Sequence, residues 1–453
     1  MGLAEEYRRK HVTAEEAVRV VRSGDWVEYG QFAVQAVALD RALAARKDAL
    51  WDVKIRATTR AAGIPETVKA DPSAEHFVYH NLHFSGADRK LHDQNLCWFM
   101  PILYHEVPRY YRENCRVDVA MLPVAPMDTA GHFNFSLSNS FSRAICDAAK
   151  TLILEVNPNL PVCPGGAQES VDLSEADLIV EANWPIPELP VITPSAVDEA
   201  IAARLMEEMG DGCCLQLGIG GMPNAVGVLL AKSDLKDLGI HTEMFCDSMV
   251  DLAGAGRVTG ARKTRDRGKI VYTFAMGTQK AYRFLDGNSL CASFHVDYTN
   301  DPWIIAQNDK VMAINNCVEI DLFGQVCSES AGTRQISGTG GQLDFTYGAY
   351  RSKGGKAFLC LGSTFEKNAT RYSRIKPLLT EGSAVTIPRS MVSYVVTEYG
   401  IANLKGKSTW ERAEAIIGLA HPDFRDGLVK EAERLRIWRR RAERRAPRIE
   451  QNN

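Results

Sequence analysis

Hydrophobic positions in the second half of the chain fall into short apolar runs that alternate with stretches of helical periodicity. Strands are predicted at residues 213–217, 241–246, 270–275, 311–320, 357–361 and 392–397, and helices at 196–208, 224–231, 279–286 and 409–418. Ser195 follows Pro194 and is a suitable N-cap for the first of these helices. Alternation of this kind predicts an α/β fold with mainly parallel sheets flanked by helices.

The two halves of the chain are similar to each other. The segment SGDWVEYGQFAVQAVALDRALA, which includes Gly24, is similar to GDGCCLQLGIGGMPNAVGVLLA, which includes Gly212. A second pair of segments, MDTAGHFNFSLS and IDLFGQVCSES, aligns Asp128 with Asp321 at nearly the same offset. We therefore expect two similar open α/β domains that arose by an internal duplication.

The boundary between the two domains is predicted in a proline-rich segment. The stretch NWPIPELPVITPS at residues 183–195 has the composition of a linker. A chain of 453 residues is long enough for two domains that each bury a core. We place an N-terminal domain at residues 1–190 and a C-terminal domain at residues 191–453.

Composition and charge exclude several classes of protein. The chain is 45% hydrophobic and 24% charged, with a net charge of −3, which argues against a nucleic-acid partner bound by bulk electrostatics. The eleven cysteines form no CxxC pair, and those at Cys213 and Cys214 fit buried, reduced thiols better than a catalytic pair. The N-terminus has no secretory apolar region, and no apolar run approaches the roughly 20 residues of a membrane span. A cytoplasmic protein without a membrane partner is expected.

Two glycine-rich turns are the strongest chemical signal. In LQLGIGGMPNAV, the apolar residues read as the end of a buried strand, Gly218, Gly220 and Gly221 as a turn, and Asn224 as a helix start. The segment SGTGGQLDF, which begins at Ser337, offers a second such turn. Backbone N–H groups bared at a helix N-terminus stabilise an anion or a developing oxyanion. Plain tight turns and phosphate-binding turns are the alternatives.

Glu243 is the candidate nucleophile. It follows the first turn in the segment IHTEMF, between apolar residues, where an idle charge would be unfavourable. A surface or salt-bridged role is the alternative for any single carboxylate. Glu398, in TEYG, is a rival carboxylate, for which we favour a structural role. Two oxyanion cradles around one glutamate suggest acyl chemistry.

Other catalytic constellations are not expected. His132 and His241 lie near predicted turns and strands, but no further ligand stands at a metal-binding spacing from either of them. The GxSxG motif of serine hydrolases is also missing from the sequence. We therefore predict neither a metal site nor a tightly bound cofactor.

Four motifs in order resemble those of a known family. GIGGMPNAV with the following Glu243, SGTGGQLDF, VVTEYGIANLKGKS and AHPDFR together resemble the acetyl-CoA hydrolase/transferase family, from about Tyr7 to Leu428. The resemblance implies an enzyme that moves CoA between short-chain carboxylic acids, such as butyryl-CoA or 4-hydroxybutyryl-CoA with acetate. It also implies that Glu243 attacks the thioester, forms a mixed anhydride and then a glutamyl-CoA thioester, with ping-pong kinetics.

The resemblance also assigns roles to other residues of this chain. The two oxyanion donors of the family match the backbone N–H groups of Ile219 and Gly341, and an active-site asparagine matches Asn300 in DYTNDP. Asn300 is alternatively a turn cap, because Asp301 and Pro302 follow it. The positions that match CoA contacts are Gly218, Gly220, Gly221, Met222, Pro223, Asn224, Val318, Gly340, Gly341 and Lys353.

The N-terminal half is expected to shape the acyl pocket. It carries GQFAVQA where the second half has GIGGMPNA, so it lacks the glycine turn. From the repeat we expect Gln31, and residues of NLHFSGADRK at 81–90, to face the acyl group. The expected partners are an acyl-CoA and a carboxylate such as acetate, and the resemblance implies a homodimer or a larger homo-oligomer.

Three interpretations stay open at this point. In a hydrolase of the same fold, water in place of an acid would resolve the glutamyl intermediate. A ligand sensor without catalysis is the alternative from another class, because fold analogy alone does not fix function. The arginine-rich C-terminal segment from Lys430 onward is predicted to form a solvated amphipathic helix, with phosphate contacts as the alternative.

Overall fold

Two large parallel sheets organise the protein, whose computed structural model describes residues 2–439. The first sheet has the order β11-β8-β6-β1-β3-β4-β5, with β2 antiparallel beside β1, and the second has the order β28-β27-β23-β18-β12-β13-β15-β17-β9. Only the edge strand β28 runs antiparallel in the second sheet. The strands of the first sheet are β1 (Trp26–Gln31), β2 (Val34–Gln35), β3 (Val53–Thr58), β4 (Phe77–Asn81), β5 (Trp98–Phe99), β6 (Val117–Val124), β8 (Ala149–Val156) and β11 (Leu178–Glu181).

The second sheet and several short ones complete the strand content. The second sheet contains β9 (Gly165–Ala167), β12 (Cys214–Leu217), β13 (Gly239–His241), β15 (Ile270–Tyr272), β17 (Cys291–Phe294), β18 (Val311–Asn316), β23 (Lys356–Cys360), β27 (Tyr394–Thr397) and β28 (Gly400–Asn403). The short sheets contain β7 (His132–Asn134), β10 (Ser170–Asp172), β14 (Met244–Phe245), β16 (Phe274–Ala275), β19 (Glu319–Asp321), β20 (Val326–Cys327), β21 (Ser330–Ala331), β22 (Arg334–Gln335), β24 (Thr364–Lys367), β25 (Thr370–Ser373) and β26 (Ile375–Lys376).

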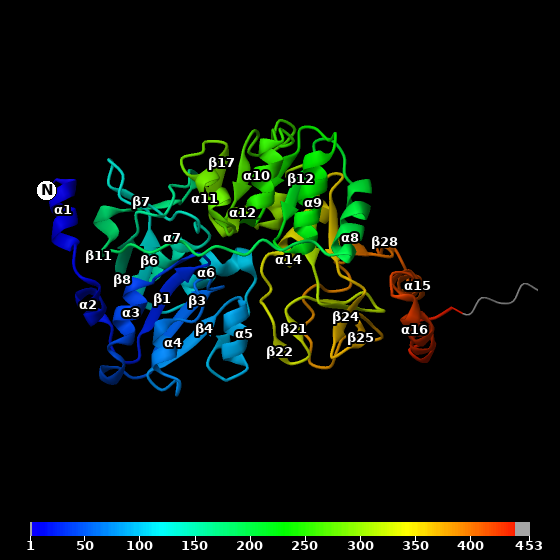
Figure 1. Cartoon of the computed structure of the whole chain (residues 1–453), viewed down its shortest axis with the longest axis horizontal. Coiled ribbons are helices and arrows are strands. Elements are labelled where there is room, and N and C mark those ends of the chain that lie inside the picture. Colours follow the sequence, from blue (N-terminus) through cyan, green and yellow to red (C-terminus); the bar gives the residue numbers. More distant parts are fainter. Residues whose placement is uncertain (1, 440–453) are drawn as a thin grey trace, which may run out of the picture.

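Helices flank both sheets (Figure 1). Those of the first half are α1 (Leu3–Lys10), α2 (Ala14–Ala17), α3 (Ala38–Ala44), α4 (Glu66–Ala70), α5 (Gly86–His92), α6 (Val107–Glu113) and α7 (Ser142–Ala148). Those of the second half are α8 (Ala196–Glu207), α9 (Gly221–Lys232), α10 (Asp247–Gly254), α11 (Gln279–Leu285), α12 (Val296–Thr299), α13 (Pro302–Ile305), α14 (Gln342–Arg351), α15 (Thr409–Gly418) and α16 (Pro422–Arg434). The 3-10 helix η3 (Tyr104–Glu106) precedes α6.

The internal repeat is visible in the topology. If β1 is matched with β12, the first seven-strand order β11-β8-β6-β1-β3-β4-β5 has the same chain sequence as β27-β23-β18-β12-β13-β15-β17. The local turns agree as well. Gly24 and Gly212 both have positive φ before the matched strands, and Asp128 and Asp321 each accept backbone N–H groups two and four residues later. The prediction of two similar α/β halves with mainly parallel sheets is therefore confirmed.

The predicted elements of the second half are all present, with three changes. The runs predicted as single strands at 241–246, 270–275 and 311–320 are each split, into β13 and β14, β15 and β16, and β18 and β19. The first two splits matter most, because Glu243 occupies the break between β13 and β14 and its carbonyl accepts N–H groups from Thr273 and Phe274. The pattern did not reveal β17, the short helices α10, α12 and α13, or the ten-residue helix α14.

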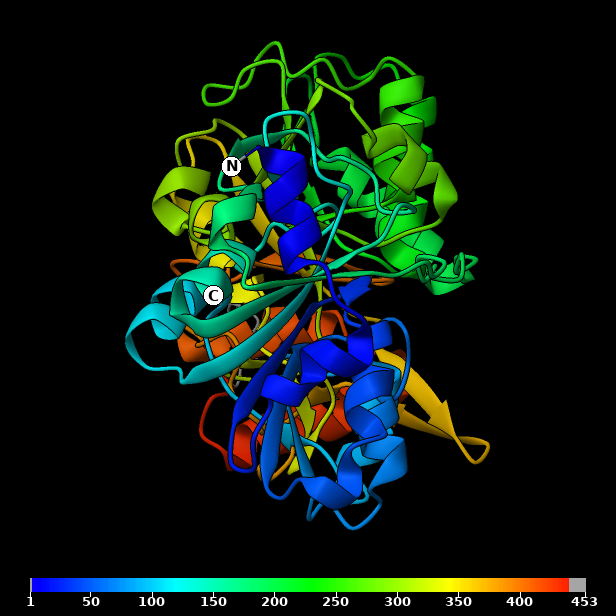
Figure 2. The ribbon, with the colours of Figure 1, turned by 90° about the vertical axis from the view of Figure 1, so that its left-hand side faces the viewer.

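The two halves pack against each other, and the N-terminal half contributes one strand to the second sheet. The linker runs across the molecule from β11 to α8 (Figure 1), and seen from the side the N-terminal sheet and the helices α8 and α9 lie on opposite sides (Figure 2). Strand β9, from before the linker, pairs with β17 at the edge of the second sheet. Trp184, near the start of the linker, is buried in the core of the second sheet and donates from Nε1 to Oε1 of Glu155.

Three simpler expectations can be compared with the described residues. All eleven cysteines are free, and only Cys115 is not buried, as expected for reduced thiols in the interior. No helix within residues 2–439 combines the length and apolar character that a membrane span requires. In the same range, no group of three or more His, Cys, Asp or Glu side chains is arranged to hold a metal ion. Most of the predicted C-terminal arginine helix lies outside the described residues.

Candidate active site

The first glycine turn, Glu243 and Asn316 lie at the carboxyl ends of β12, β13 and β18. In open parallel sheets this edge is where ligands usually bind, because the strand-to-helix turns gather there. The first glycine turn follows β12, and Glu243 follows β13. Oγ1 of Thr242 donates to the carbonyl of Leu217 at 3.2 Å and so ties the glutamate segment to the end of β12.

Glu243 is half-buried and held by two groups. Nδ2 of Asn300 donates a hydrogen bond to its Oε2 at 2.7 Å, and the backbone N–H of Gly341 also stabilises its charge. A Cβ atom at Gly341 would overlap both Oε2 of Glu243 and Nδ2 of Asn300. Glycine at this position is therefore a steric requirement of the close approach between the second turn and the glutamate.

The electrostatic setting favours a reactive carboxylate. Burial, together with the negative charge of Asp344, raises the pKa of Glu243 to about 7, although Asn300 and the N–H of Gly341 oppose the shift. Carboxyl groups with a pKa near the working pH are frequent at functional sites. Poor solvation of the carboxylate, which raises the pKa, also makes it a better nucleophile.

The first glycine turn presents backbone to the surface. Gly220 has a φ of +123°, which other residues rarely adopt, and the side chain of Ile219 is 43% exposed. Helix α9 begins at Gly221, three residues before the predicted start at Asn224. Its first turn therefore contains Met222 and Pro223. A Cβ atom at Gly221 would lie 2.5 Å from Oδ2 of Asp198.

The predicted CoA contacts of the first turn divide into two groups. Met222 and Pro223 are buried, with Met222 only 2% exposed, so their side chains serve the packing of α9. Nδ2 of Asn224 donates to the carbonyl of Ile192 in the linker at 3.0 Å. The exposed Ile219 and the partly exposed Gly220 and Asn224 can meet a ligand, since all three line one pocket.

The second turn is supported from both halves of the chain. Gly340 has a φ of +52°, and Gly341 is the N-cap of α14. Gly338 lies directly against the backbone of Leu82 and His83, where a Cβ atom would clash with the carbonyl of Leu82. The predicted segment 81–90 therefore does reach the site, through His83.

Asn316, at the end of β18, lies between the two turns. Nε2 of Gln342 donates to its carbonyl at 2.8 Å, and a Cβ atom on Gly220 would lie 3.8 Å from its Nδ2. Val318, two residues later, is half-buried, and its N–H donates to the carbonyl of Cys327. The carbonyl of Val318 accepts a hydrogen bond from the guanidinium of Arg374 at 3.2 Å, so both backbone groups of Val318 are paired within the protein.

Lys353 lies apart from these residues. It follows the opposite end of α14, so the ten residues of this helix separate it from Gly341 by about 15 Å at 1.5 Å per residue. Its carbonyl accepts the N–H of Lys310, which precedes β18. A ligand would have to extend along the whole helix to reach both Glu243 and Lys353.

Glu398 has the structural setting that we expected for it. Its Oε2 accepts the N–H of Ser363 at 2.9 Å and its Oε1 accepts the hydroxyl of the same residue at 2.5 Å. The guanidinium of Arg204 donates to its backbone carbonyl. These contacts fasten β27 to its surroundings.

Gln31 is buried at the end of β1. Its Nε2 donates to Oγ of Ser142 at 3.3 Å, and its Oε1 has no hydrogen-bond partner among the described residues. Phe32, which follows it with a φ of +56°, stacks on Phe274 with ring centroids 3.6 Å apart. Since the N–H of Phe274 donates to the carbonyl of Glu243, this hairpin reaches the strand beside the glutamate.

Four functional candidates escaped the sequence interpretation. Tyr104 and His105 come from η3, Asp344 from α14, and Asn316 from the end of β18. Asp344 belongs to the motif SGTGGQLDF, so its presence there was a usable signal. His105 and Tyr104 carry no such signal, because only the packing of the two halves brings η3 to the site.

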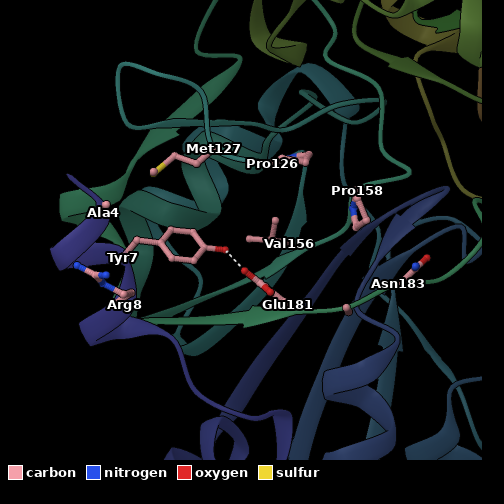
Figure 3. A pocket seen from close by; sticks show the side chains of 10 residues that line it. Ala4, Tyr7, Arg8, Pro126, Met127, Val156, Pro158, Glu181 and Asn183 are labelled. Carbon is pink, nitrogen blue, oxygen red and sulfur yellow. Dashed lines mark hydrogen bonds between the residues drawn. The ribbon is translucent and has the colours of Figure 1, made fainter.

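Two pockets are present among the described residues, and one of them adjoins the site. One of about 480 Å³ is lined by the linker, by Ile219 and Gly220 of the first turn, and by Cys246 and Asp247. A larger one of about 720 Å³ lies at α1, where the hydroxyl of Tyr7 donates to Glu181 at 2.9 Å (Figure 3). None of the predicted site residues lines the larger pocket, whereas the smaller one adjoins the first turn.

Comparison with known proteins agrees with this geometry. The model of the acetyl-CoA hydrolase/transferase N-terminal domain matches residues 1–191, and that of the C-terminal domain matches residues 277–432. A probable butyrate:acetyl-CoA coenzyme A-transferase of Syntrophomonas wolfei is 51% identical over 97% of this chain and 98% of its own. The chain belongs to the acetyl-CoA hydrolase/transferase family. The resemblance found in the four motifs is thereby confirmed.

Further members of the acetyl-CoA hydrolase/transferase family extend the comparison. The 4-hydroxybutyrate coenzyme A transferase of Clostridium kluyveri is 41% identical over 95% of this chain and 99% of its own. The crystal structure of RipA from Yersinia pestis has a TM-score of 0.89 and 38% identity, covering 96% of this chain and all of its own. The predicted fold class and the prediction of an enzyme of the CoA-transferase class are confirmed.

Proposed function

We propose that the protein transfers CoA between short-chain carboxylic acids, with butyryl-CoA or 4-hydroxybutyryl-CoA as donor and acetate as acceptor, through a glutamyl-CoA thioester at Glu243. The names of the two relatives above support these substrates. The observation that carries the mechanism is the setting of Glu243, a poorly solvated carboxylate held by Asn300 and facing the second glycine turn.

The reaction follows from this arrangement. A carboxylate oxygen of Glu243 attacks the thioester carbonyl carbon, the C–S bond breaks, and CoA thiolate leaves behind a mixed anhydride. The thiolate then attacks the glutamyl carbonyl carbon and releases the first carboxylic acid as its anion. An acceptor carboxylate reverses both steps and leaves as the new acyl-CoA. The two half-reactions give ping-pong kinetics.

Two backbone donors serve the two oxyanions. The N–H of Gly341 already points at the carboxylate of Glu243, so it suits the oxyanion that forms on the glutamyl carbon. The exposed turn at Ile219 suits the oxyanion that forms on the substrate acyl carbon. Removal of one such donor typically costs about 3–4 kcal/mol of transition-state stabilisation.

No other residue has to move a proton in this scheme, but Glu243 must be ionised to attack. Because burial raises its pKa to about 7, the ionised fraction grows as the pH rises through neutrality. The acidic limb of kcat/KM, which reports the free enzyme, is therefore expected near pH 7.

The decisive experiment measures the intact mass after incubation with butyryl-CoA alone. We expect the wild-type protein to gain covalent CoA and Glu243→Ala to gain none, and addition of acetate should discharge the adduct. A wild-type protein that never carries CoA, or a Glu243→Ala variant with normal turnover, would refute the proposal.

The same experiment separates the rival functions. Loss of butyryl-CoA that depends on acetate indicates transfer, whereas equal loss in buffer alone indicates hydrolysis through the same glutamate. Ligand binding with neither adduct nor turnover indicates a sensor. The homo-oligomer and the cytoplasmic location inferred from the sequence stay predictions, and analytical ultracentrifugation tests the first of them.

A further inference from the structure

Behind Asn300 lies a buried pair of side chains that the reaction scheme above does not use. Nδ1 of His105 and Oδ1 of Asp344 are 2.7 Å apart, and the backbone N–H of His105 donates to the other carboxylate oxygen at 3.3 Å. Asp344 is fully buried, whereas the His105 side chain is 25% exposed. The two residues come from different halves of the chain, so this contact spans the interface at the site.

The pair is connected to Glu243 in two ways. Asn300, whose Nδ2 donates to Glu243, also stabilises the charge of Asp344 through its side chain. Oδ1 of Asn300 is buried and has no partner among the described residues, so its amide is oriented by what it donates to. The negative charge of Asp344 also acts directly on Glu243.

We propose that His105 and Asp344 are positioning residues for Glu243. Their charge pair acts through Asn300, which holds the carboxylate of Glu243 toward the second turn, and it sets the charge of that carboxylate. This inference rests on the proposed function, because it assigns a purpose to the ionisation of Glu243. The residues touch neither of the reacting carbonyl groups in the scheme.

The charges around the pair define what each member does. Burial raises the pKa of Asp344, and the hydrogen bond and charge of His105 oppose that shift. Burial alone would lower the pKa of His105, but Asp344 raises it above its usual value, with smaller contributions from Glu106 and Asp301. Each charge therefore favours the ionised state of the other member, and in the proposed role His105 partly neutralises the charge that Asp344 presents to Glu243.

The remaining titratable groups near Glu243 come from three elements. His241, at the end of β13, is buried, and burial lowers its pKa to about 3, so it is neutral at physiological pH. Tyr104, on η3, is buried, and the charge of Glu243 contributes to raising its pKa. His83, after β4, lies beside Gly340, and burial lowers its pKa to about 4, so it is neutral at physiological pH. None of these three groups changes charge near pH 7, which leaves Asp344 and His105 as the groups that tune the glutamate.

Two substitutions should move the acidic limb of kcat/KM in opposite directions. Asp344→Asn removes a negative charge from beside Glu243, so the limb should move down by about one pH unit. At pH 6 the ionised fraction of a group with a pKa of about 7 is roughly one tenth, and a one-unit shift raises it to roughly half. His105→Gln keeps a donor toward Asp344 but removes its countercharge, so the limb should move up.

A double variant and a matched control complete the test. In Asp344→Asn/His105→Gln the acidic limb of kcat/KM should lie at the same pH as in Asp344→Asn, because no negative charge is left at residue 344 for His105 to neutralise. Glu113→Gln removes an exposed charge from α6, where Glu113 pairs with Arg109 and not with His105 or Asp344, and its limb should match that of the wild type. Circular dichroism identifies any variant that does not fold. If one single variant is unfolded, the acidic limb of the other single variant tests the positioning role.

The results separate this inference from the proposed function. An unchanged or raised limb in Asp344→Asn, or an unchanged limb in His105→Gln, overturns the positioning role even if the wild type carries covalent CoA. If the pair only stabilised the fold, its loss would lower kcat in both variants but would leave their acidic limbs of kcat/KM at the same pH. Absence of the adduct on the wild type refutes the glutamyl mechanism independently of where the limbs lie.

Discussion

Asn300 donates a hydrogen bond from Nδ2 to Oε2 of Glu243 over 2.7 Å, although 57 residues separate the two in the chain. The bond stabilises the charged carboxylate and fixes the oxygen that remains free to attack. A hydrogen bond to a charged group contributes about 1.5–3 kcal/mol. This contact is the first target for mutation.

Asn300→Ala should lower kcat/KM for butyryl-CoA by about 10- to 100-fold, because it removes that stabilisation. It should also move the acidic limb to higher pH, since Asn300 holds the pKa of Glu243 down. The control is Asn288→Ala, which loses a 2.9 Å amide hydrogen bond to Phe284 and should leave the kinetics unchanged. Steady-state rates over pH 5–9 provide the measurement, and a wild-type profile in Asn300→Ala would contradict the role.

Gly341→Ala should abolish transfer while the protein still folds. The added methyl group would overlap the carboxylate of Glu243 and the amide of Asn300, so the nucleophile must move away from the turn. We expect a loss of at least about 100-fold in kcat, in line with the removal of an oxyanion donor. Gly427→Ala, at a position in α16 with open space around it, should retain full activity. Comparable rates in the two variants would exclude close packing at the second turn.

Glu243→Gln should stabilise the folded protein at high pH. Burial raises the pKa of the folded-state carboxyl to about 7 from about 4.5 in the unfolded chain, so its charge disfavours folding above that range. The folded state binds the proton more tightly, and stability is therefore lost as the pH rises from about 4.5 to 7. Glutamine avoids this loss, which amounts to about 3 kcal/mol at pH 8 and vanishes near pH 4.5. Thermal unfolding at pH 5 and pH 8 tests this prediction. A Tm difference between Glu243→Gln and the wild type that is independent of pH would speak against a raised pKa of Glu243.

Gln31→Leu should change the choice of acyl group. The buried Oε1 of Gln31 is an acceptor without a partner among the described residues, and it suits a hydroxyl donor of the substrate. A site that hydrogen-bonds a hydroxyl discriminates more strongly than an apolar pocket does. We expect the ratio of kcat/KM for 4-hydroxybutyryl-CoA over butyryl-CoA to fall about tenfold, the equivalent of 1.4 kcal/mol. An unchanged ratio would remove Gln31 from the acyl pocket.

The sequence by itself determined the parts of the fold that depend on local periodicity. The strands β12, β23 and β27 and the helices α8 and α15 follow from apolar runs, caps and helical patterns that act over a few residues. The self-similarity around Gly24 and Gly212 even indicated the two matching sheets. The glycine turns and the glutamate in an apolar segment could likewise be recognised from the sequence. Both depart from the residues that a regular strand or helix has at such positions.

Only the tertiary structure decided which other residues join them. His105 and Asp344 lie 239 residues apart, and no periodicity relates η3 to α14, so their contact exists only because the two halves pack face to face. The same packing brings His83 to the second turn, and it leaves Lys353 a helix length away. Burial, which raises the pKa of Glu243, is likewise a property of the assembled interface, because desolvation depends on every atom around the carboxylate and not on its neighbours in the chain.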